Sequence, residues 1–248
     1  MPTKNPEIII LETPEEVFIE AANIFIETAS LAITQRGVFI VALSGGNTPL
    51  GLYKLFAERP YCGNINWQKT HLFWSDERCV GPSDAQSNFR LANESFIKKV
   101  QLPEKNIHRV KGESCPASAD EYEAEIKAFF KLGEDEFPAF DLTLLGMGTD
   151  GHFASIFPSS PAFKSEKIAV EAPAPNINSS RVTLTPSAIN NSKNIIFLVT
   201  GPDKALALKQ CLEGELKPEK YPAQITRLSK GRVLWLVDKA AASMITKR

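Results

Sequence analysis

Short runs of Ile, Val, Leu and Phe recur along the chain, and each run is too short to be a helix. Such runs are typical of strands that are buried on both faces of a sheet. The stretches between them mostly carry apolar residues at helical spacing. The pattern predicts buried strands at residues 8–11, 38–43, 71–74, 140–145, 195–199 and 233–237.

Helix signals fill the stretches between these runs. Thr13, Pro14 and Glu16 form a capping box with proline at the first helical position, and Gly37 is placed to end that helix. Strands that alternate with helices pair in parallel through crossover connections. We therefore expect one α/β domain over residues 1–248, an open, mostly parallel sheet with helices on both faces. Further helices are predicted at residues 49–58, 87–100, 117–132 and 202–213.

Composition excludes several classes of protein. The chain has 28 Lys and Arg against 29 Asp and Glu, which gives no electrostatic reason to bind nucleic acid or an anionic membrane. No apolar run approaches the roughly 18 residues of a membrane span, and residues 8–11 are too short for a secretory signal. Cys62, Cys79, Cys115 and Cys211 form no C-x-x-C pair. We expect free thiols and a cytoplasmic location.

The least regular stretch is residues 157–181, which holds four prolines and several Ser and Asn residues. We expect a long surface excursion there. Ligands of open α/β sheets bind outside the carboxyl ends of the strands. The loops that follow the apolar runs are therefore the places to look for chemistry.

The loop after the second predicted strand leads directly into a helix. Its two glycines let backbone N–H groups turn toward one point, and a helix N-terminus favours a bound anion. Thr48 can cap the helix, and Pro49 suits its first position. A plain tight turn is the alternative. We expect a phosphate site at Ser44, Gly45, Gly46, Asn47 and Thr48.

Three charged residues, Asp76, Glu77 and Arg78, follow the third predicted strand. Arg78 can hold a phosphate or carboxylate through two hydrogen bonds while an acidic neighbour fixes its guanidinium. A solvated turn with a surface ion pair is the alternative. Ser87 begins the next helix and Asn88 lies in its first turn, so Asp76, Arg78 and Asn88 are candidate substrate-binding residues.

A glycine-rich loop after the strand at residues 140–145 carries Asp150 and His152. An imidazole has an ordinary pKa of about 6.5, which suits proton transfer near neutrality. The nearby carboxylate and the strand-end position favour a catalytic His152 over a structural one. His71 and His108 lack such surroundings.

Two cationic residues complete the candidate site. Arg181 begins a strand-like run, and Lys204 lies at the start of the helix after residues 195–199. A lysine in the first helical turn opposes the helix dipole. Its place is explained if a bound anion shares that helix terminus, and a solvated surface position is the alternative.

Taken in order, these four loops resemble those of the 6-phosphogluconolactonases, over roughly residues 38–208. The wider superfamily that the chain resembles includes the glucosamine-6-phosphate deaminases, which usually carry an acidic pair in place of Asp-Glu-Arg, so Arg78 favours the lactonases. The resemblance implies a Rossmann-like α/β fold without a metal or organic cofactor. It also implies that water attacks a small sugar-phosphate lactone, 6-phospho-D-glucono-1,5-lactone, to give 6-phosphogluconate in the oxidative pentose phosphate pathway.

The resemblance also implies roles for the candidate residues. His152 would be the general base, and Asp150 would orient its imidazole. The loop at residues 44–48 and basic side chains would hold the phosphate, while Arg78 would bind substrate or stabilise developing negative charge. The chain departs from the commoner family residues at Asn47, where Ser is frequent, and at Phe153, where Thr is frequent, so we expect no hydroxyl contact there.

Several other readings stay open. A serine hydrolase would use Ser44 as nucleophile, although the G-x-S-x-G elbow is absent. The glycine-rich loop spells G-x-G-x-x-G, but Pro158 and Pro161 would interrupt the helix that a dinucleotide fold needs after its third glycine, Gly151. A sugar-phosphate deaminase or isomerase and a non-catalytic sugar-phosphate sensor are further alternatives, and the oligomeric state is not specified. A metal site would use Asp76, Glu77, Asp150 and His152.

Overall fold

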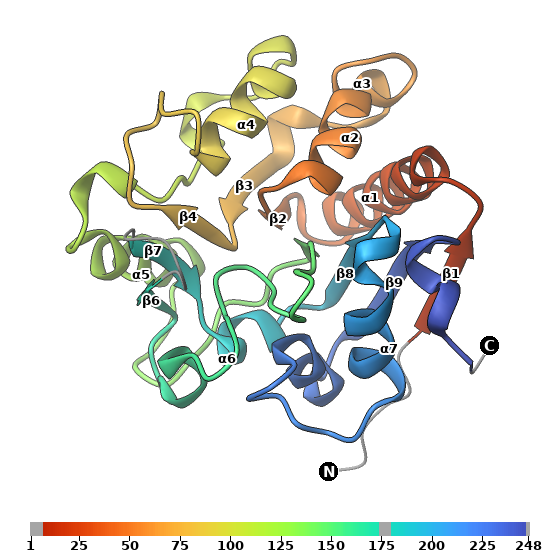
Figure 1. The fold of residues 1–248 in the computed structure, drawn as a ribbon. Helices are drawn as coiled ribbons and strands as arrows, with labels where there is room; N and C mark the ends of the chain where they lie inside the picture. The colour runs from red at the N-terminus through yellow and green to blue at the C-terminus, as the bar shows by residue number, and fades with distance from the viewer. Residues whose placement is uncertain (1–6, 174–179, 247–248) are drawn as a thin grey trace.

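The main sheet of the protein is fully parallel, and it contains every strand that the sequence predicts. The computed structural model describes residues 7–173 and 180–246. Predicted and observed strand ends differ by at most two residues. In spatial order the sheet (Figure 1) runs β1 (Glu7–Leu11), β9 (Arg232–Asp238), β8 (Asn194–Val199), β5 (Leu142–Leu145), β2 (Phe39–Leu43) and β3 (Thr70–Trp74).

The helices follow the predicted order with shifted ends. In α1 (Pro14–Arg36) the Thr13 side chain accepts a hydrogen bond from the Glu16 amide, and Gly37 ends the helix with a φ of 79°. The other predicted helices are α2 (Asn47–Phe56), α4 (Asn88–Ser95), α5 (Ser118–Phe130) and α7 (Ala205–Glu213), which follows a 3₁₀ turn (Pro202–Lys204), and the unpredicted short helices are α3 (Tyr61–Asn64) and α6 (Pro186–Asn190).

Helix α1 is long and apolar enough, by length and composition, to cross a membrane. Glutamates interrupt its sequence, so α1 contains no long uninterrupted apolar run. In the structure its buried side chains, which include Val17, Ala21 and Phe25, belong to the hydrophobic core, and the helix packs on β2, β8 and β9. A core helix of this kind is weak evidence for a membrane span, and the expectation that no segment spans a membrane stays a prediction.

A second, antiparallel sheet lies beside α5 (Figure 1). It consists of β4 (Asp76–Arg78), β7 (Ser180–Leu184) and β6 (Ala169–Pro173). The prediction of an irregular excursion over residues 157–181 is therefore wrong for β6 and the start of β7, while residues 174–179 lie outside the described residues. Strand β6 is a short edge strand with mixed exposure and gives no continuous apolar run, so the sequence pattern missed it. The strand-like run predicted to begin at Arg181 corresponds to β7, which begins one residue earlier.

The expectation of four free cysteines is also wrong. Cys79 and Cys115 form a disulfide, with their Cα atoms 5.7 Å apart, whereas Cys62 and Cys211 are free thiols. Cys79 directly follows β4, and the turn before Cys115 packs on the same strand, where a Cβ on Gly112 would lie 2.2 Å from the Arg78 carbonyl oxygen. This proximity is tertiary, so the spacing of cysteines along the chain does not reveal it.

The order of the strands reverses at β2. From β2 the chain first adds β3 on one side and later adds β5 on the other side. In parallel sheets, such a reversal opens a crevice at the carboxyl ends of the two central strands, since their loops turn to opposite faces. The crevice lies here between the loop after β2 and the glycine-rich loop after β5.

The opposite end of the sheet is held by one buried carboxylate, Asp141, whose side chain is 3% exposed. It accepts hydrogen bonds from Arg36, at the end of α1, from the Ile40 amide in β2 at 3.0 Å and from Lys193 Nζ at 2.8 Å. The Asp141 carbonyl accepts a further bond from the Asn194 side chain at 2.8 Å. Asp141 thereby joins α1, β2, β5 and β8.

We predict that Asp141→Ala lowers the free energy of unfolding by about 2–4 kcal/mol, because it leaves a buried amide and two cations without their acceptor. Urea denaturation measures this change. Asp120→Ala is the matched control, since it removes an exposed partner of Lys167 and should have little effect. Equal denaturation midpoints for the two variants would contradict the role given to Asp141.

Candidate active site

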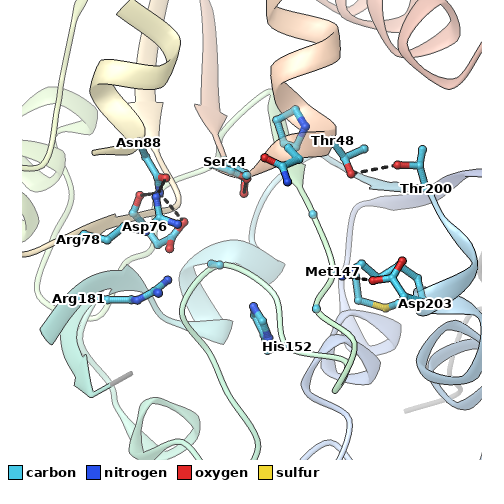
Figure 2. A pocket seen from close by; sticks show the side chains of 18 residues that line it. Ser44, Thr48, Asp76, Arg78, Asn88, Met147, His152, Arg181, Thr200 and Asp203 are labelled. Carbon is cyan, nitrogen blue, oxygen red and sulfur yellow. Dashed lines mark hydrogen bonds and ion pairs between the residues drawn. The ribbon is translucent and has the colours of Figure 1, made fainter. Parts of the chain in front are cut away.

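A cavity of about 380 Å³ opens at the carboxyl ends of β2 and β5, and Figure 2 shows the side chains around it. All the residues predicted to bind substrate line this cavity, and so does His152. Asp150 is not in the lining but contacts Nδ1 of the His152 imidazole. The structure therefore brings several separate strand ends together around one cavity. The predicted residues in the lining are Ser44, Gly45, Gly46, Asn47, Thr48, Asp76, Arg78, Asn88, His152, Arg181 and Lys204.

The loop after β2 presents the N-terminus of α2 to the cavity. Gly46, with a φ of 103°, occupies the cap position, and no side chain caps the first amides of the helix. The prediction that Thr48 caps the helix is wrong. Thr48 lies in the first turn, and its hydroxyl lies 3.2 Å from the Thr200 hydroxyl at the end of β8 (Figure 2). Uncapped amides at a helix N-terminus suit a phosphate.

Two contacts fix the backbone of this loop. The Tyr53 hydroxyl donates to the Ser44 carbonyl at 2.5 Å and accepts from the Ser44 amide at 3.2 Å. Burial raises the pKa of Tyr53 well above its ordinary value, so the phenol stays a donor. A Cβ on Gly45 would lie only 1.7 Å from Asn88 Oδ1. Glycine is therefore required where the loop meets α4.

Glu77 is buried, with 2% exposure, and it organises the segment that carries Arg78. Its carboxylate accepts hydrogen bonds from the amides of Arg78 at 2.8 Å, Asn88 at 2.7 Å and Phe89 at 2.8 Å, and from the Ser87 hydroxyl at 3.0 Å. Burial raises the pKa of Glu77 although all four donors oppose that shift. Glu77 thus joins β4 to the start of α4.

Arg78 is fixed by an amide side chain and not by a carboxylate, which corrects the sequence prediction. Its guanidinium donates to Asn88 Oδ1 and to the Gln86 carbonyl at 2.7 Å. Asn88 in turn donates to the Asp76 carbonyl at 2.8 Å. The alternative of a solvated surface turn is wrong, because Asp76 and Glu77 are 4% and 2% exposed.

Arg78 and Arg181 are register partners across β4 and β7. In each, the Nε atom is buried and has no hydrogen-bond partner among the described residues. Burial, followed by the charge of Arg78, lowers the pKa of Arg181. Two adjacent guanidinium groups without direct carboxylate partners favour a bound anion.

His152 is oriented by Asp150, whose Oδ1 lies 2.6 Å from His152 Nδ1. Burial raises the pKa of Asp150, but the His152 amide and imidazole together hold that pKa below its ordinary value. The ionised carboxylate favours a proton on Nδ1, which leaves Nε2 as the acceptor. A Cβ on Gly148 would lie 2.0 Å from His152 Nδ1, so the pair requires glycine at that position.

The rest of this loop is anchored to the second sheet and to the core. The Ser155 hydroxyl donates to Asp76 Oδ2 at 2.6 Å. The Phe153 ring lies in the core, 6.1 Å from Phe197 between ring centroids, so it offers nothing to the cavity. No helix opens at Gly151, which confirms that the G-x-G-x-x-G pattern is not a dinucleotide fingerprint here.

Lys204 lies in the lining with its side chain 23% exposed and 3.3 Å from Asp203. Its side chain is therefore partly buried at the cavity, and substrate contact by Lys204 stays a prediction. The lining also contains residues that were not predicted as site residues, among them Met147, Ala154, Thr200 and Asp203. Thr200 and Asp203 follow β8 directly, so the strand-end rule would have found them, whereas Met147 and Ala154 carry no chemical signal.

The groups of the alternative metal site are directed at different partners. Glu77 bonds amides, Asp76 bonds Ser155 and Asp150 bonds His152. Across residues 7–173 and 180–246 no group of three or more potential ligands occurs.

The other two histidines lie away from the cavity. His71 Nδ1 lies 3.0 Å from His108 Nε2, and Glu125 lies 2.8 Å from His108 Nδ1. Burial, followed by the neighbouring His108 and Lys105, lowers the pKa of His71 to about 4. His108 thus has an acidic partner, Glu125, but neither His71 nor His108 lines the cavity.

Known proteins match the chain over most of its length. A family model described as glucosamine-6-phosphate isomerases/6-phosphogluconolactonase matches residues 12–235. The 6-phosphogluconolactonase of Synechocystis sp. is 36% identical, over 95% of this chain and 97% of its own length. That of Haemophilus influenzae is 38% identical, over 83% of this chain and 87% of its own length.

A solved structure agrees with these sequence matches. The 6-phosphogluconolactonase from Trypanosoma cruzi superimposes with a TM-score of 0.88 and 29% identity, covering 100% of this chain and 99% of that one. Similarity thus extends from the sequence to the fold, and the range that the family model matches spans the four loops around the cavity. The chain belongs to the glucosamine-6-phosphate isomerase/6-phosphogluconolactonase family.

Proposed function

We propose that the protein hydrolyses 6-phospho-D-glucono-1,5-lactone to 6-phosphogluconate in the oxidative pentose phosphate pathway. The observation that supports this most strongly is the gathering of an Asp-oriented imidazole, two guanidinium groups and an uncapped helix N-terminus around one cavity. Family relatives named as 6-phosphogluconolactonases add weight to the choice of substrate.

The reaction needs an activated water and a stabilised oxyanion. His152 Nε2 takes a proton from water as the water oxygen attacks C1, and the carbonyl electron pair moves onto its oxygen. Arg78 lies where it can stabilise that oxyanion. The oxyanion then re-forms the carbonyl and breaks the bond between C1 and the ring oxygen, which takes the proton back from the imidazolium. The acid product ionises and releases one proton to solution.

The phosphate of the substrate fits the opposite side of the cavity. The first amides of α2 supply hydrogen-bond donors there, and Lys204 supplies a positive charge. These amides lie at the end of the predicted phosphate loop, which comprises Ser44, Gly45, Gly46, Asn47 and Thr48. The remaining candidates, Asp76, Asn88 and Arg181, shape the cavity between these ends. The proposed reaction thus uses side chains, backbone amides and water.

The serine-nucleophile alternative finds no support in the geometry. Among the described residues Ser44 Oγ hydrogen-bonds to the Gly45 carbonyl at 3.5 Å and not to His152. Rapid formation of a covalent acyl-enzyme in pre-steady-state kinetics would support the serine nucleophile instead. Release of ammonia from glucosamine 6-phosphate would favour a deaminase, and binding of 6-phosphogluconate without lactone hydrolysis would favour a sensor.

We further propose a single α/β domain and a cytoplasmic location. The Cys79–Cys115 disulfide is not typical of that compartment, where thiols are kept reduced. Cell fractionation tests the location directly.

Proton release from freshly generated 6-phosphogluconolactone, corrected for spontaneous opening, tests the proposed reaction. We expect the wild-type chain to accelerate proton release, with saturation in lactone concentration. Acceleration no greater than that given by an equal amount of heat-denatured chain would overturn the proposal.

We predict that His152→Ala lowers kcat by about 10²–10⁴-fold, because no other group at that position accepts the proton of water. Binding of 6-phosphogluconate, measured by calorimetry, should stay within about threefold of wild type, since the phosphate donors are unchanged. A variant that loses affinity and turnover in the same proportion would contradict the assignment of His152 as general base.

We predict that Arg78→Met lowers kcat/KM by about 10²–10³-fold, because a preorganised donor for the oxyanion is lost. Steady-state kinetics at several lactone concentrations measures the loss. Arg90→Met is the control, since Arg90 pairs with Glu94 on α4 outside the cavity. Comparable losses in the two variants would indicate damage to α4 and not loss of a substrate contact.

A further inference from the structure

Phe157 contacts two groups of the candidate site that come from different elements. Its ring centroid lies 4.5 Å from that of His152, with 41° between the ring planes. The Arg181 guanidinium lies over the same ring, with its central carbon 5.6 Å from the centroid. His152 belongs to the loop after β5 and Arg181 to β7, so one half-buried phenyl ring joins them.

Arg181 has fewer polar partners than Arg78. Arg78 is held by hydrogen bonds to Asn88 and Gln86. For the Arg181 side chain, no hydrogen bond or ion pair is present within residues 7–173 and 180–246, and its Nε atom is buried without a partner. Asp76 and Glu77 favour this cation through their charges, while the Phe157 ring lies against its face.

His152 is also incompletely held by polar contacts. Its imidazole bonds Asp150 through Nδ1, and the Asp150 side chain is 45% exposed. One hydrogen bond to a half-exposed carboxylate leaves the ring free to turn about that bond. A ring packed against the imidazole limits this turning and keeps Nε2 directed at one place.

We propose that Phe157 is a positioning residue that holds Arg181 and His152 in their working orientations. Cation–π contact holds the guanidinium by its face and leaves its N–H groups free for the substrate. Contact with the imidazole fixes the direction of proton transfer. The inference rests on the proposed function, in which His152 is the general base and Arg181 faces the substrate.

Phe157→Leu keeps an apolar side chain but removes the aromatic face. It should raise KM about fivefold through Arg181 and lower kcat about fivefold through His152, since each aromatic contact contributes modestly. Phe157→Tyr should stay within about twofold of wild type in both constants, because the ring is retained. Phe163→Leu is the matched control: Phe163 is another half-buried ring of the same segment, packed on the core. It should leave both constants unchanged.

A double-mutant cycle separates the two contacts. In an Arg181→Met background, Phe157→Leu should no longer raise KM, whereas its effect on kcat should persist. A KM effect of the same size in both backgrounds would overturn the link to Arg181. Unchanged KM and kcat in Phe157→Leu, with only a lower melting temperature, would overturn the whole proposal.

A readout independent of activity distinguishes failure of this inference from failure of the proposed function. The chain has three histidines, so the ring protons of His152 can be assigned by comparison with His152→Gln. Ring current from Phe157 should shift these NMR signals in wild type and in Phe157→Tyr, and Phe157→Leu should abolish the shift. If the shift is lost as expected but no variant hydrolyses lactone, the proposed function fails and the contact stands. If the signals do not move, the positioning role fails even in an active enzyme.

Discussion

The site depends on one topological constraint, the reversal of strand order at β2. Because β3 and β5 lie on opposite sides of β2, the loops after β2 and β5 leave a crevice between them. The uncapped helix N-terminus is on one side of that crevice and His152 is on the other. Because the strands are parallel, these loops lie together at the carboxyl ends of the strands. Asp141 joins neighbouring strands at the opposite end of the sheet.

The small antiparallel sheet adds two guanidinium groups to the crevice. Its register sets Arg78 beside Arg181, and like charges this close together repel each other. The nearby carboxylates do not pair with them directly, because Glu77 is occupied by amides and Asp76 by Ser155 and Asn88. The positive charge therefore faces the cavity, where an anionic substrate or oxyanion compensates it.

Local sequence signals sufficed for the main sheet and for α1. Continuous apolar runs mark the six parallel strands, and the Thr13 cap and Gly37 mark the ends of α1. Because ligand-binding loops follow such strands, the same signals led to the residues around the cavity. The resemblance to known lactonases supplied their expected roles, which the geometry alone does not assign.

The features that were missed are set by tertiary contacts. Three of these features depend on segments that meet only on folding. They are the pairing of Cys79 with Cys115, the bond between Arg78 and Asn88, and the burial of Glu77. Strand β6 was not predicted because its exposure is mixed. Phe157 looked like part of an irregular excursion, yet its ring lies against His152 and Arg181.

A crystal structure of the protein with bound 6-phosphogluconate tests the central claim most directly. The account predicts that the phosphate contacts the amides at the start of α2, and that the C1 carboxylate lies within hydrogen-bond reach of His152 Nε2. A product molecule bound outside the crevice, or bound with its phosphate against His152, would contradict the account.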